Sequence, residues 1–152
     1  MEGWLYLAAV VDLCLRGVVG WATSANNDRT LAIDALRRAC GSRKPKAGWI
    51  HHSDCGCVYV GGEYRSELRR RGGLSSMSGK GDWCDDAVAE RLFASIKGEC
   101  LDRHHLYTRT EANSLIKECI FAFYDLRRMH STFGYESPVA FELEIHAPRE
   151  AA

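Results

Sequence analysis

The 152-residue sequence contains no apolar run that approaches the roughly 20 residues a membrane-spanning helix needs. Its first apolar stretch, LYLAAVV, is short and leads directly to Asp12 and Arg16, which is not typical of a secretory signal peptide. Internal repeats, low-complexity segments and linkers are absent as well. With 46% hydrophobic and 26% charged residues, the composition indicates one soluble domain, which we expect to be cytoplasmic and not associated with a membrane.

The sequence also lacks an excess of charge of either sign. Twenty basic residues balance 20 acidic ones, so the formal net charge is zero. Proteins that bind nucleic acids strongly are often basic overall, so any contact with DNA must come from local basic patches. The seven cysteines are odd in number and scattered, which favours reduced thiols in a cytoplasmic protein over a disulfide framework.

The alternation of apolar and polar residues predicts an α/β domain with a mixed sheet that begins with a hairpin. Residues 4–13 and 17–24 predict the two strands of that hairpin. A helix is expected at 26–41, with Asn27 or Asp28 as its N-cap and Gly41 at its end. The later elements are a strand at 49–54, a short basic helix at 62–73, a strand at 74–78, a helix at 81–100 capped by Asp82 or Asp85, a helix at 108–126 with a Thr108–Glu111 capping box, and a tail in which Pro138 acts as a breaker.

The stretch HHSDCGCVYV, residues 51–60, gathers several polar and metal-binding residue types. A zinc site is disfavoured, because no second pair of ligands follows at metal-finger spacing and a strand would point His51 and His52 to opposite faces. Asp54 ends the predicted strand, and polar side chains at this end of strands in α/β sheets commonly face a ligand crevice. Taken alone, Asp54 could also simply begin a turn.

A second acidic residue, Glu90, lies in the helix expected at 81–100. Lys97 follows it by seven residues, nearly two turns, so both would share one helix face within about 20°. That face could also be merely solvated. Thirty-five residues separate Asp54 from Glu90. An acid at a strand end, this interval, a helical glutamate and a basic residue seven positions later together form a specific pattern.

This pattern resembles the catalytic core of DDE-type insertion-sequence transposases and retroviral integrases. Four stretches in the same order carry the resemblance over roughly residues 2–142: EGWLYLAAVVDLCLRGVVGW, HHSDCGCVY, MSGKGDWCDDAVAERLFASIKGE and FYDLRRMHSTFGYESPVAF. The resemblance implies a ribonuclease H-like mixed sheet flanked by helices. It also implies an integrase-like core at 1–142, followed by a C-terminal tail at 143–152.

In that family three carboxylates hold two Mg²⁺ or Mn²⁺ ions, which activate water or a DNA 3′-hydroxyl. Clustered carboxylates repel one another, and hard divalent cations relieve that repulsion. The two ions then share the charge on the attacking and leaving oxygens of phosphoryl transfer. The resemblance implies that Asp54 and Glu90 are catalytic metal ligands, the second and third acids of the set. It implies that Lys97 contacts DNA phosphate.

The sequence departs from the family at its start. The family's first acid lies on a strand before the hairpin, and neither has a counterpart in residues 1–152. Asp12 matches the end of the family's second strand, where we expect it to cap a turn. The resemblance therefore implies a sheet without its first strand, weakened metal binding and a chain that does not cut or join DNA by itself. The alternative is a non-catalytic module that binds DNA or pairs with an intact transposase or with a second copy.

Two basic clusters are the candidate contacts to DNA phosphates, beside Lys97. Such contacts give affinity that is independent of sequence and sensitive to salt. Each cluster could instead be an ordinary solvated surface. The candidates are Arg69, Arg70, Arg71 and Lys80 before the Glu90 helix, and Arg127, Arg128 and His130 after the last helix.

Overall fold

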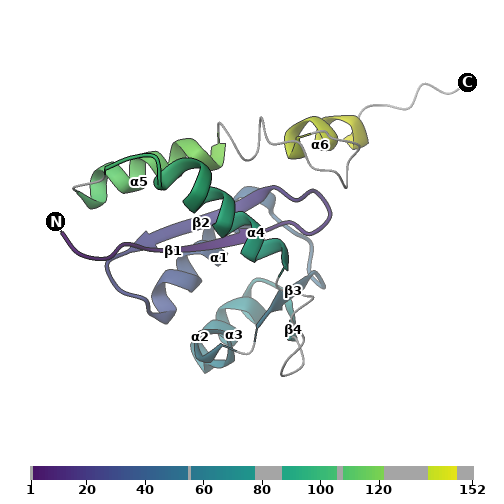
Figure 1. The fold of residues 1–152 in the computed structure, drawn as a ribbon. Coiled ribbons are helices and arrows are strands. Elements are labelled where there is room, and N and C mark those ends of the chain that lie inside the picture. The colour runs from purple at the N-terminus through teal and green to yellow at the C-terminus, as the bar shows by residue number, and fades with distance from the viewer. Residues whose placement is uncertain (1, 55, 78–86, 106–107, 122–136, 147–152) are drawn as a thin grey trace, which may run out of the picture.

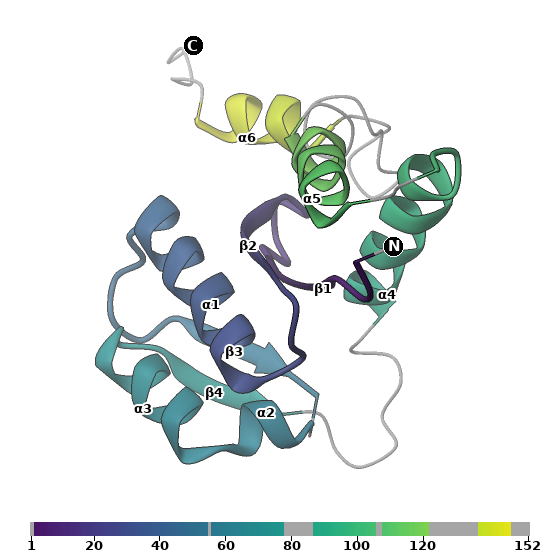
Figure 2. The same ribbon diagram turned by 90° about the vertical axis from the view of Figure 1, so that its left-hand side faces the viewer.

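A β-hairpin lies at the centre of the computed structural model, which describes residues 2–54, 56–77, 87–105, 108–121 and 137–146. Its strands are β1 (Tyr6–Val11) and β2 (Val18–Ser24), paired antiparallel as expected. Helix α1 (Arg29–Arg43) covers one side of the hairpin, and α4 (Ala87–Ser95) and α5 (Arg109–Glu118) lie on the other (Figure 1, Figure 2). The arrangement confirms an α/β domain that begins with a hairpin.

The turn of the hairpin is held by Asp12. Its Oδ1 accepts hydrogen bonds from the backbone N–H groups of Cys14 and Leu15 at 2.8 and 3.0 Å. The backbone then closes through Arg16, which has a positive φ of 56°. The interpretation of Asp12 as a turn cap is therefore confirmed.

Helix α1 starts where the sequence predicts and ends later. Asp28 is the N-cap, and its carboxylate accepts from the Leu31 N–H at 3.2 Å. The expected end at Gly41 is wrong, because the helix continues through Arg43 and stops at Lys44, which has left-handed backbone angles and donates its N–H to the Cys40 carbonyl. A Cβ added at Gly41 would meet nothing within 4 Å beyond the helix's own backbone, so no neighbour requires glycine there, and it is accommodated inside the helix.

Helix α1 packs unusually close to β2. A Cβ atom added at Gly20 would lie 2.4 Å from the Ala39 nitrogen and 2.5 Å from the Ala35 carbonyl oxygen. Only glycine on the strand and small residues on the helix allow this approach. On that side Ala22, Leu31 and Ala35 form a buried cluster.

The opposite side of the hairpin is covered by a second apolar cluster, from α4, α5 and the π-helical turn between them, η1 (Ile96–Leu101). Thr108 and Glu111 form the expected capping box of α5. The predicted caps Asp82 and Asp85, and the end of the helix expected at 108–126, lie outside the described residues. The buried members of this cluster are Leu92, Ile96, Ile116, Cys119 and Ile120.

Cys100 of η1 and Cys119 after α5 form a disulfide. The expectation of reduced thiols is therefore wrong for this pair. Packing of η1 against α5 brings the two Cα atoms to 6.2 Å, within bridging range, and nothing in the spacing of the cysteines indicates that contact. Among the described residues Cys14, Cys40 and Cys57 are free thiols.

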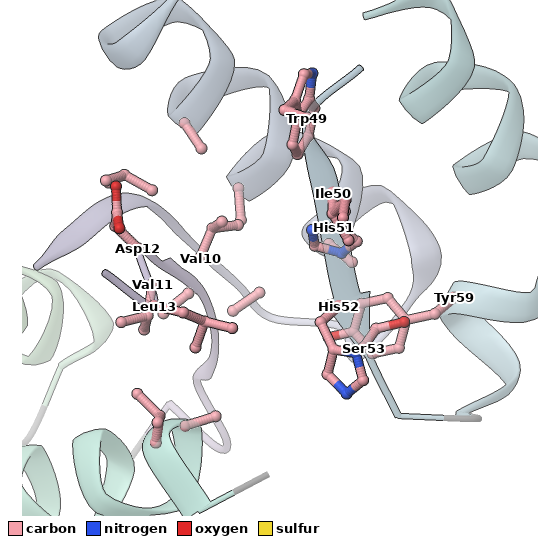
Figure 3. Close-up of a pocket in the computed structure, with 18 of the residues that line it drawn as sticks. Val10, Val11, Asp12, Leu13, Trp49, Ile50, His51, His52, Ser53 and Tyr59 are labelled. Atoms are coloured by element: carbon pink, nitrogen blue, oxygen red, sulfur yellow. The ribbon is translucent and has the colours of Figure 1, made fainter. Parts of the chain in front are cut away.

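A second, parallel pair of strands lies beside the hairpin. It consists of β3 (Ile50–Ser53) and β4 (Leu74–Met77), and α3 (Gly62–Arg70) connects them as the sequence predicts. The short helix α2 (Cys57–Val60) was not predicted. The two strand pairs share no hydrogen bonds within the described residues, so the expected mixed sheet is present as two separate halves. A cleft separates β1 from β3 (Figure 3).

The C-terminal segment contains a helix, α6 (Pro138–His146), where a tail was expected. The interpretation of Pro138 as a breaker is wrong, because proline fits the first turn of a helix, whose N–H groups lack partners anyway. Ser137 supports this start, accepting the N–H of Ala140 at its Oγ. An ion pair from Glu142 to Arg43 joins α6 to the end of α1, and the boundary expected after residue 142 falls inside α6.

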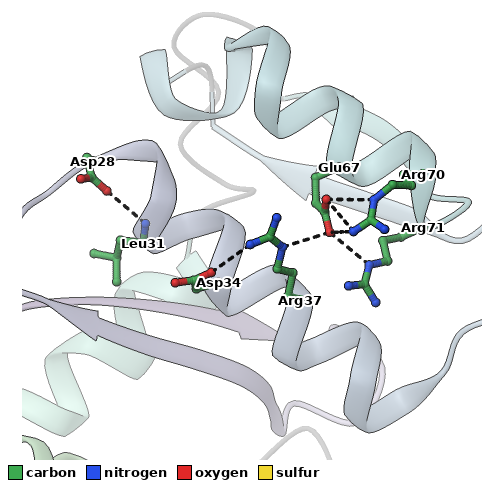
Figure 4. A network of polar contacts seen from close by, with 7 residues as sticks. All are labelled: Asp28, Leu31, Asp34, Arg37, Glu67, Arg70 and Arg71. Carbon is green, nitrogen blue, oxygen red and sulfur yellow. Dashed lines mark hydrogen bonds and ion pairs between the residues drawn. The ribbon is translucent and has the colours of Figure 1, made fainter.

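Helix α3 is joined to α1 by a buried carboxylate. Glu67 is 7% exposed and accepts hydrogen bonds from Arg37 of α1 and from Arg70 and Arg71 beside it (Figure 4). The bonds from Arg70 do most to lower the pKa of Glu67 to about 2, from an ordinary 4.5, and those from Arg37 and Arg71 add to the effect against the opposing influence of burial. None of the described helices is long and apolar enough to cross a lipid bilayer.

Gly20→Ala should lower the free energy of unfolding by roughly 1–3 kcal/mol, because its Cβ overlaps the α1 backbone. Gly41→Ala is the matched control. It adds the same methyl group where nothing lies within 4 Å, so it should stabilise the helix by about 0.5–1 kcal/mol. Urea unfolding measures both, and a Gly20→Ala chain as stable as the parent would contradict the close packing.

Glu67→Gln should remove a pH-dependent part of the stability. Because folding lowers the pKa of Glu67, its contribution is complete above about pH 4.5 and is lost as the pH falls towards about 2. The difference between the two pKa values corresponds to roughly 3 kcal/mol in the free energy of unfolding. Urea unfolding at pH 7 and pH 3 should show the parent losing more stability than the variant. Glu63→Gln, which breaks only the exposed pair with Arg29, should cost less than about 1 kcal/mol at either pH. Equal pH profiles for parent and Glu67→Gln would refute the network.

Candidate catalytic cleft

The cleft between the two halves of the sheet has a volume of about 630 Å³. Consecutive residues of β1 and the turn after it, Ala8 to Cys14, line one wall, and Trp49 to Asp54 line the opposite wall. Adjacent side chains of a strand point to opposite faces, so a wall made of consecutive residues is a strand edge. Residues of α1 and α4 close the remaining sides, and Figure 3 shows the two edges facing each other.

Asp54 follows the last residue of β3 and is one of the residues that line the cleft. Its Oδ1 accepts the N–H of Gly56 at 2.9 Å, which orients the exposed side chain. A Cβ at Gly56 would lie 2.8 Å from that same oxygen, so a larger residue there would push the Asp54 carboxylate from this position. The sequence contains this signal, since Asp followed by glycine two positions on is typical of a side-chain-stabilised turn.

Glu90 lies in the first turn of α4 and lines the same cleft from the helical side. Its side chain is exposed, whereas Leu92 on the same helix is completely buried against the hairpin. The buried face of α4 therefore determines that Glu90 points away from the apolar cluster. Asp54 and Glu90 thus line one cleft, and their catalytic roles stay predictions.

Asp12 is a third carboxylate on the cleft wall, and the sequence did not indicate that position. Its Oδ1 is already committed to two turn N–H groups. Within the described residues, no group of three or more His, Cys, Asp or Glu side chains could hold a metal ion. The carboxylate oxygens of Asp54 and Glu90 suit Mg²⁺ or Mn²⁺ in chemistry, but two carboxylates leave most of the ion's coordination to water.

The two histidines of β3 serve the structure on opposite sides of the strand. His51 Nε2 lies 2.8 Å from the hydroxyl of Tyr64 in α3, and His52 Nδ1 lies 3.1 Å from the hydroxyl of Ser76 in β4. Burial, and then the neighbouring His52, lower the pKa of His51 to about 4, so it is neutral at neutral pH. The opposite orientations agree with the exclusion of a zinc site.

Lys97 lies in η1, is exposed and is outside the set of residues that lines the cleft. The shared face with Glu90 was inferred from α-helical spacing, which ends at Ser95. The wider π-helical turn changes the angle between successive residues, so the two-turn estimate no longer applies. Contact of Lys97 with DNA stays a prediction.

The arginines of α3 lie apart from the cleft and differ in what they contact. Arg70 and Arg71 donate to Glu67, while Arg69 is exposed and donates to the Arg65 carbonyl. Part of this basic cluster is therefore structural. The other DNA-contact candidates, Lys80, Arg127, Arg128 and His130, lie outside the described residues.

Comparisons with known proteins agree with this geometry. The family model for the integrase core domain matches residues 1–82. The transposase of insertion sequence element IS904 from Lactococcus lactis is 40% identical over 141 residues, covering 93% of this chain and 56% of that protein. Transposase InsF of insertion sequence IS3A from Escherichia coli is also 40% identical over 141 residues, with 93% and 49% covered. The chain thus spans about half the length of these curated relatives.

Solved structures show the same fold at low sequence identity. The catalytic core domain of BIV integrase superimposes with a TM-score of 0.65 at 15% identity, over 91% of this chain and 86% of that one. A chain of the simian T-cell lymphotropic virus intasome, solved with the PP2A regulatory subunit B56 gamma, superimposes with a TM-score of 0.73 at 13% identity, over 96% and 50%. The ribonuclease H-like fold is confirmed, and the chain belongs to the integrase core domain family.

Proposed function

We propose that this chain is a transposase catalytic core that acts in metal-dependent phosphoryl transfer on DNA. The proposal rests on one observation: Asp54, directly after β3, and Glu90, in α4, line one cleft of an integrase core fold. Two relatives with about 40% identity are named transposases, which supports the same activity here.

In this proposal Asp54 and Glu90 hold the divalent cation. A bound cation supplies Lewis-acid stabilisation of the charge that develops on the attacking and leaving oxygens. The Gly56 N–H fixes one oxygen of Asp54, and a carboxylate keeps further acceptor capacity for a metal ion. Helix α4, anchored by Leu92, presents Glu90 from the other side.

The first acid of the family pattern would enter on an extended segment seated between β1 and β3. The cleft suits a strand, since it is bordered by two strand edges with hydrogen-bonding groups available for pairing. Large apolar side chains on its walls are open to solvent, namely Leu13, Ile50 and Phe93. A seated strand would bury them and join the two halves into one mixed sheet.

The alternative is a regulatory module that binds DNA or pairs with an intact transposase without cutting. It is favoured by one observation: Oδ1 of Asp12 accepts two N–H groups of its turn, whereas Oδ1 of Asp54 accepts one, so Asp12 has less acceptor capacity left to serve as a third metal ligand. Under this alternative the chain would lower the activity of an intact relative in a mixture.

The test compares the 152-residue chain with a version that carries an added strand bearing one Asp ahead of Glu2. We expect Mn²⁺-dependent nicking of DNA only from the extended chain, and a drop of roughly 10- to 100-fold or more in activity and Mn²⁺ affinity on Asp54→Asn or Glu90→Gln. Glu63→Gln, outside the cleft, is the control.

Two outcomes separate the readings. Nicking by the unextended chain that disappears on Glu90→Gln would show that Asp12 or another acid completes the site. An extended chain that neither binds Mn²⁺ nor cuts, while the unextended chain inhibits an intact transposase, would replace the catalytic proposal with the regulatory one.

Lys97→Ala should weaken DNA binding and reduce the slope of log affinity against log salt by about 1, as loss of one phosphate contact does. Its side chain is exposed, so the free energy of unfolding should change by less than about 0.5 kcal/mol. Arg70→Ala is the contrasting variant and should mainly destabilise the fold, because Arg70 is bound to Glu67. Loss of stability with an unchanged salt slope in Lys97→Ala would make Lys97 structural.

A further inference from the structure

The disulfide between Cys100 and Cys119 joins the two elements that follow Glu90 in the chain. Cys100 lies in η1, and Cys119, 19 positions later, follows the last residue of α5. Helix α4 runs into η1 without a break, at Ser95 and Ile96. A bridge at Cys100 therefore restrains the C-terminal end of the helical segment that carries Glu90.

The bridge lies within the apolar cluster that holds α4 on the hairpin. Cys119 is 3% exposed and packs with Leu92, Ile96 and Ile120. Cys100 is partly buried at the edge of the same cluster. Breaking the bond would leave η1 attached to α5 by side-chain packing alone.

The backbone at Cys100 is in a conformation that needs support. A π-helical turn is rare and usually short, because its hydrogen bonding is less favourable than that of an α-helix. Here the Cys100 carbonyl accepts a hydrogen bond from His104 Nδ1 at 2.8 Å, and the Asp102 N–H donates to the Lys97 carbonyl at 2.8 Å. The His104 bond and the disulfide therefore add to the turn's own backbone hydrogen bond.

We propose that Cys100 and Cys119 form a redox-sensitive link that orders α4 and its glutamate when oxidised. In reducing compartments such as the cytoplasm, disulfides are usually transient and redox-sensing. The ordering of α4 stands on the contacts described here, and only its consequence for DNA cleavage rests on the proposed function.

The chemistry is thiol–disulfide exchange with glutathione. A glutathione thiolate attacks Sγ of Cys100, the more exposed sulfur, and the Sγ–Sγ bond breaks as Cys119 leaves and takes up a proton. A second glutathione attacks the mixed disulfide, releasing Cys100 as a thiol and forming glutathione disulfide. In the reverse direction, glutathione disulfide accepts the two electrons of the protein thiols and is reduced to two glutathiones.

The experiment equilibrates the full 152-residue chain in buffers of different glutathione to glutathione disulfide ratio. Free thiols are then alkylated and the linked peptides mapped, which also reports any pairing of Cys55 and Cys84. The amount of the disulfide-linked peptide pair that contains Cys100 and Cys119 should increase with the fraction of glutathione disulfide in the buffer. The oxidised chain should melt roughly 6–12 °C higher. Amide hydrogen exchange over residues 87–101 should be slower in the oxidised chain.

In every buffer, Cys100→Ser should show the melting temperature and the exchange rates of the parent chain in its dithiol state. Cys14→Ser, which changes an exposed free thiol, should keep the full redox response. The proposal is overturned if the 100–119 peptide never forms, or if exchange over residues 87–101 is the same in both states. The parent chain alone supplies this comparison should a variant fail to fold. A redox response in the 152-residue chain, together with no DNA cleavage by the version extended with an Asp-bearing strand, would uphold the link while refuting the proposed function.

Discussion

Burial of the β1–β2 hairpin on both faces is the constraint on which the rest of the structure depends. Successive residues of YLAAVV point to opposite sides, and both sides are apolar, so each side needs a helical cover. Helix α1 supplies one cover, pressed against Gly20. Leu92 of α4 and the residues of α5 supply the other. The positions of α1 and α4, and therefore two walls of the cleft, follow from how the hairpin is buried.

The cleft acids are placed by elements whose stability does not need them. Asp54 follows β3 and is oriented by a backbone N–H, and Glu90 projects from a helix that is held by its opposite face. Both carboxylates are exposed, so neither is bound up in the core. Functional groups held by rigid elements behind them can approach a common ligand without rearrangement of the fold. This separation explains how an acid could be replaced with little loss of stability and a large loss of metal binding.

Features encoded by neighbouring residues could be predicted from the sequence. Asp28, the Thr108–Glu111 capping box and the hairpin are of this kind, because each cap is a contact within a few positions and the hairpin follows from two apolar runs joined by a short turn. The helix end predicted at Gly41 and the helix breaker predicted at Pro138 were wrong, because a helix tolerates the glycine in its interior and another helix begins at the proline. The Cys100–Cys119 bond and the contact of Arg37 with Glu67 join residues 19 and 30 positions apart, and only packing brings them together. In the site, the interval from Asp54 to Glu90 indicated that the two residues share a cleft. The position of Lys97 depends on a π-helical turn that no local sequence pattern predicts.

Glu67 neutralises part of the basic charge that the sequence places around it. A run of three arginines at 69–71 suggests a basic patch, yet Glu67 binds two of them and Arg37 as well. Of the described candidates, Arg69 and Lys97 keep exposed side chains outside that network. Each phosphate contact changes the salt dependence of binding by about one unit of slope, so contacts from these two side chains would contribute about two units. Under the proposed function the cleft itself would add to the placement of DNA, because a metal ion held by Asp54 and Glu90 would attract the phosphate that is to react.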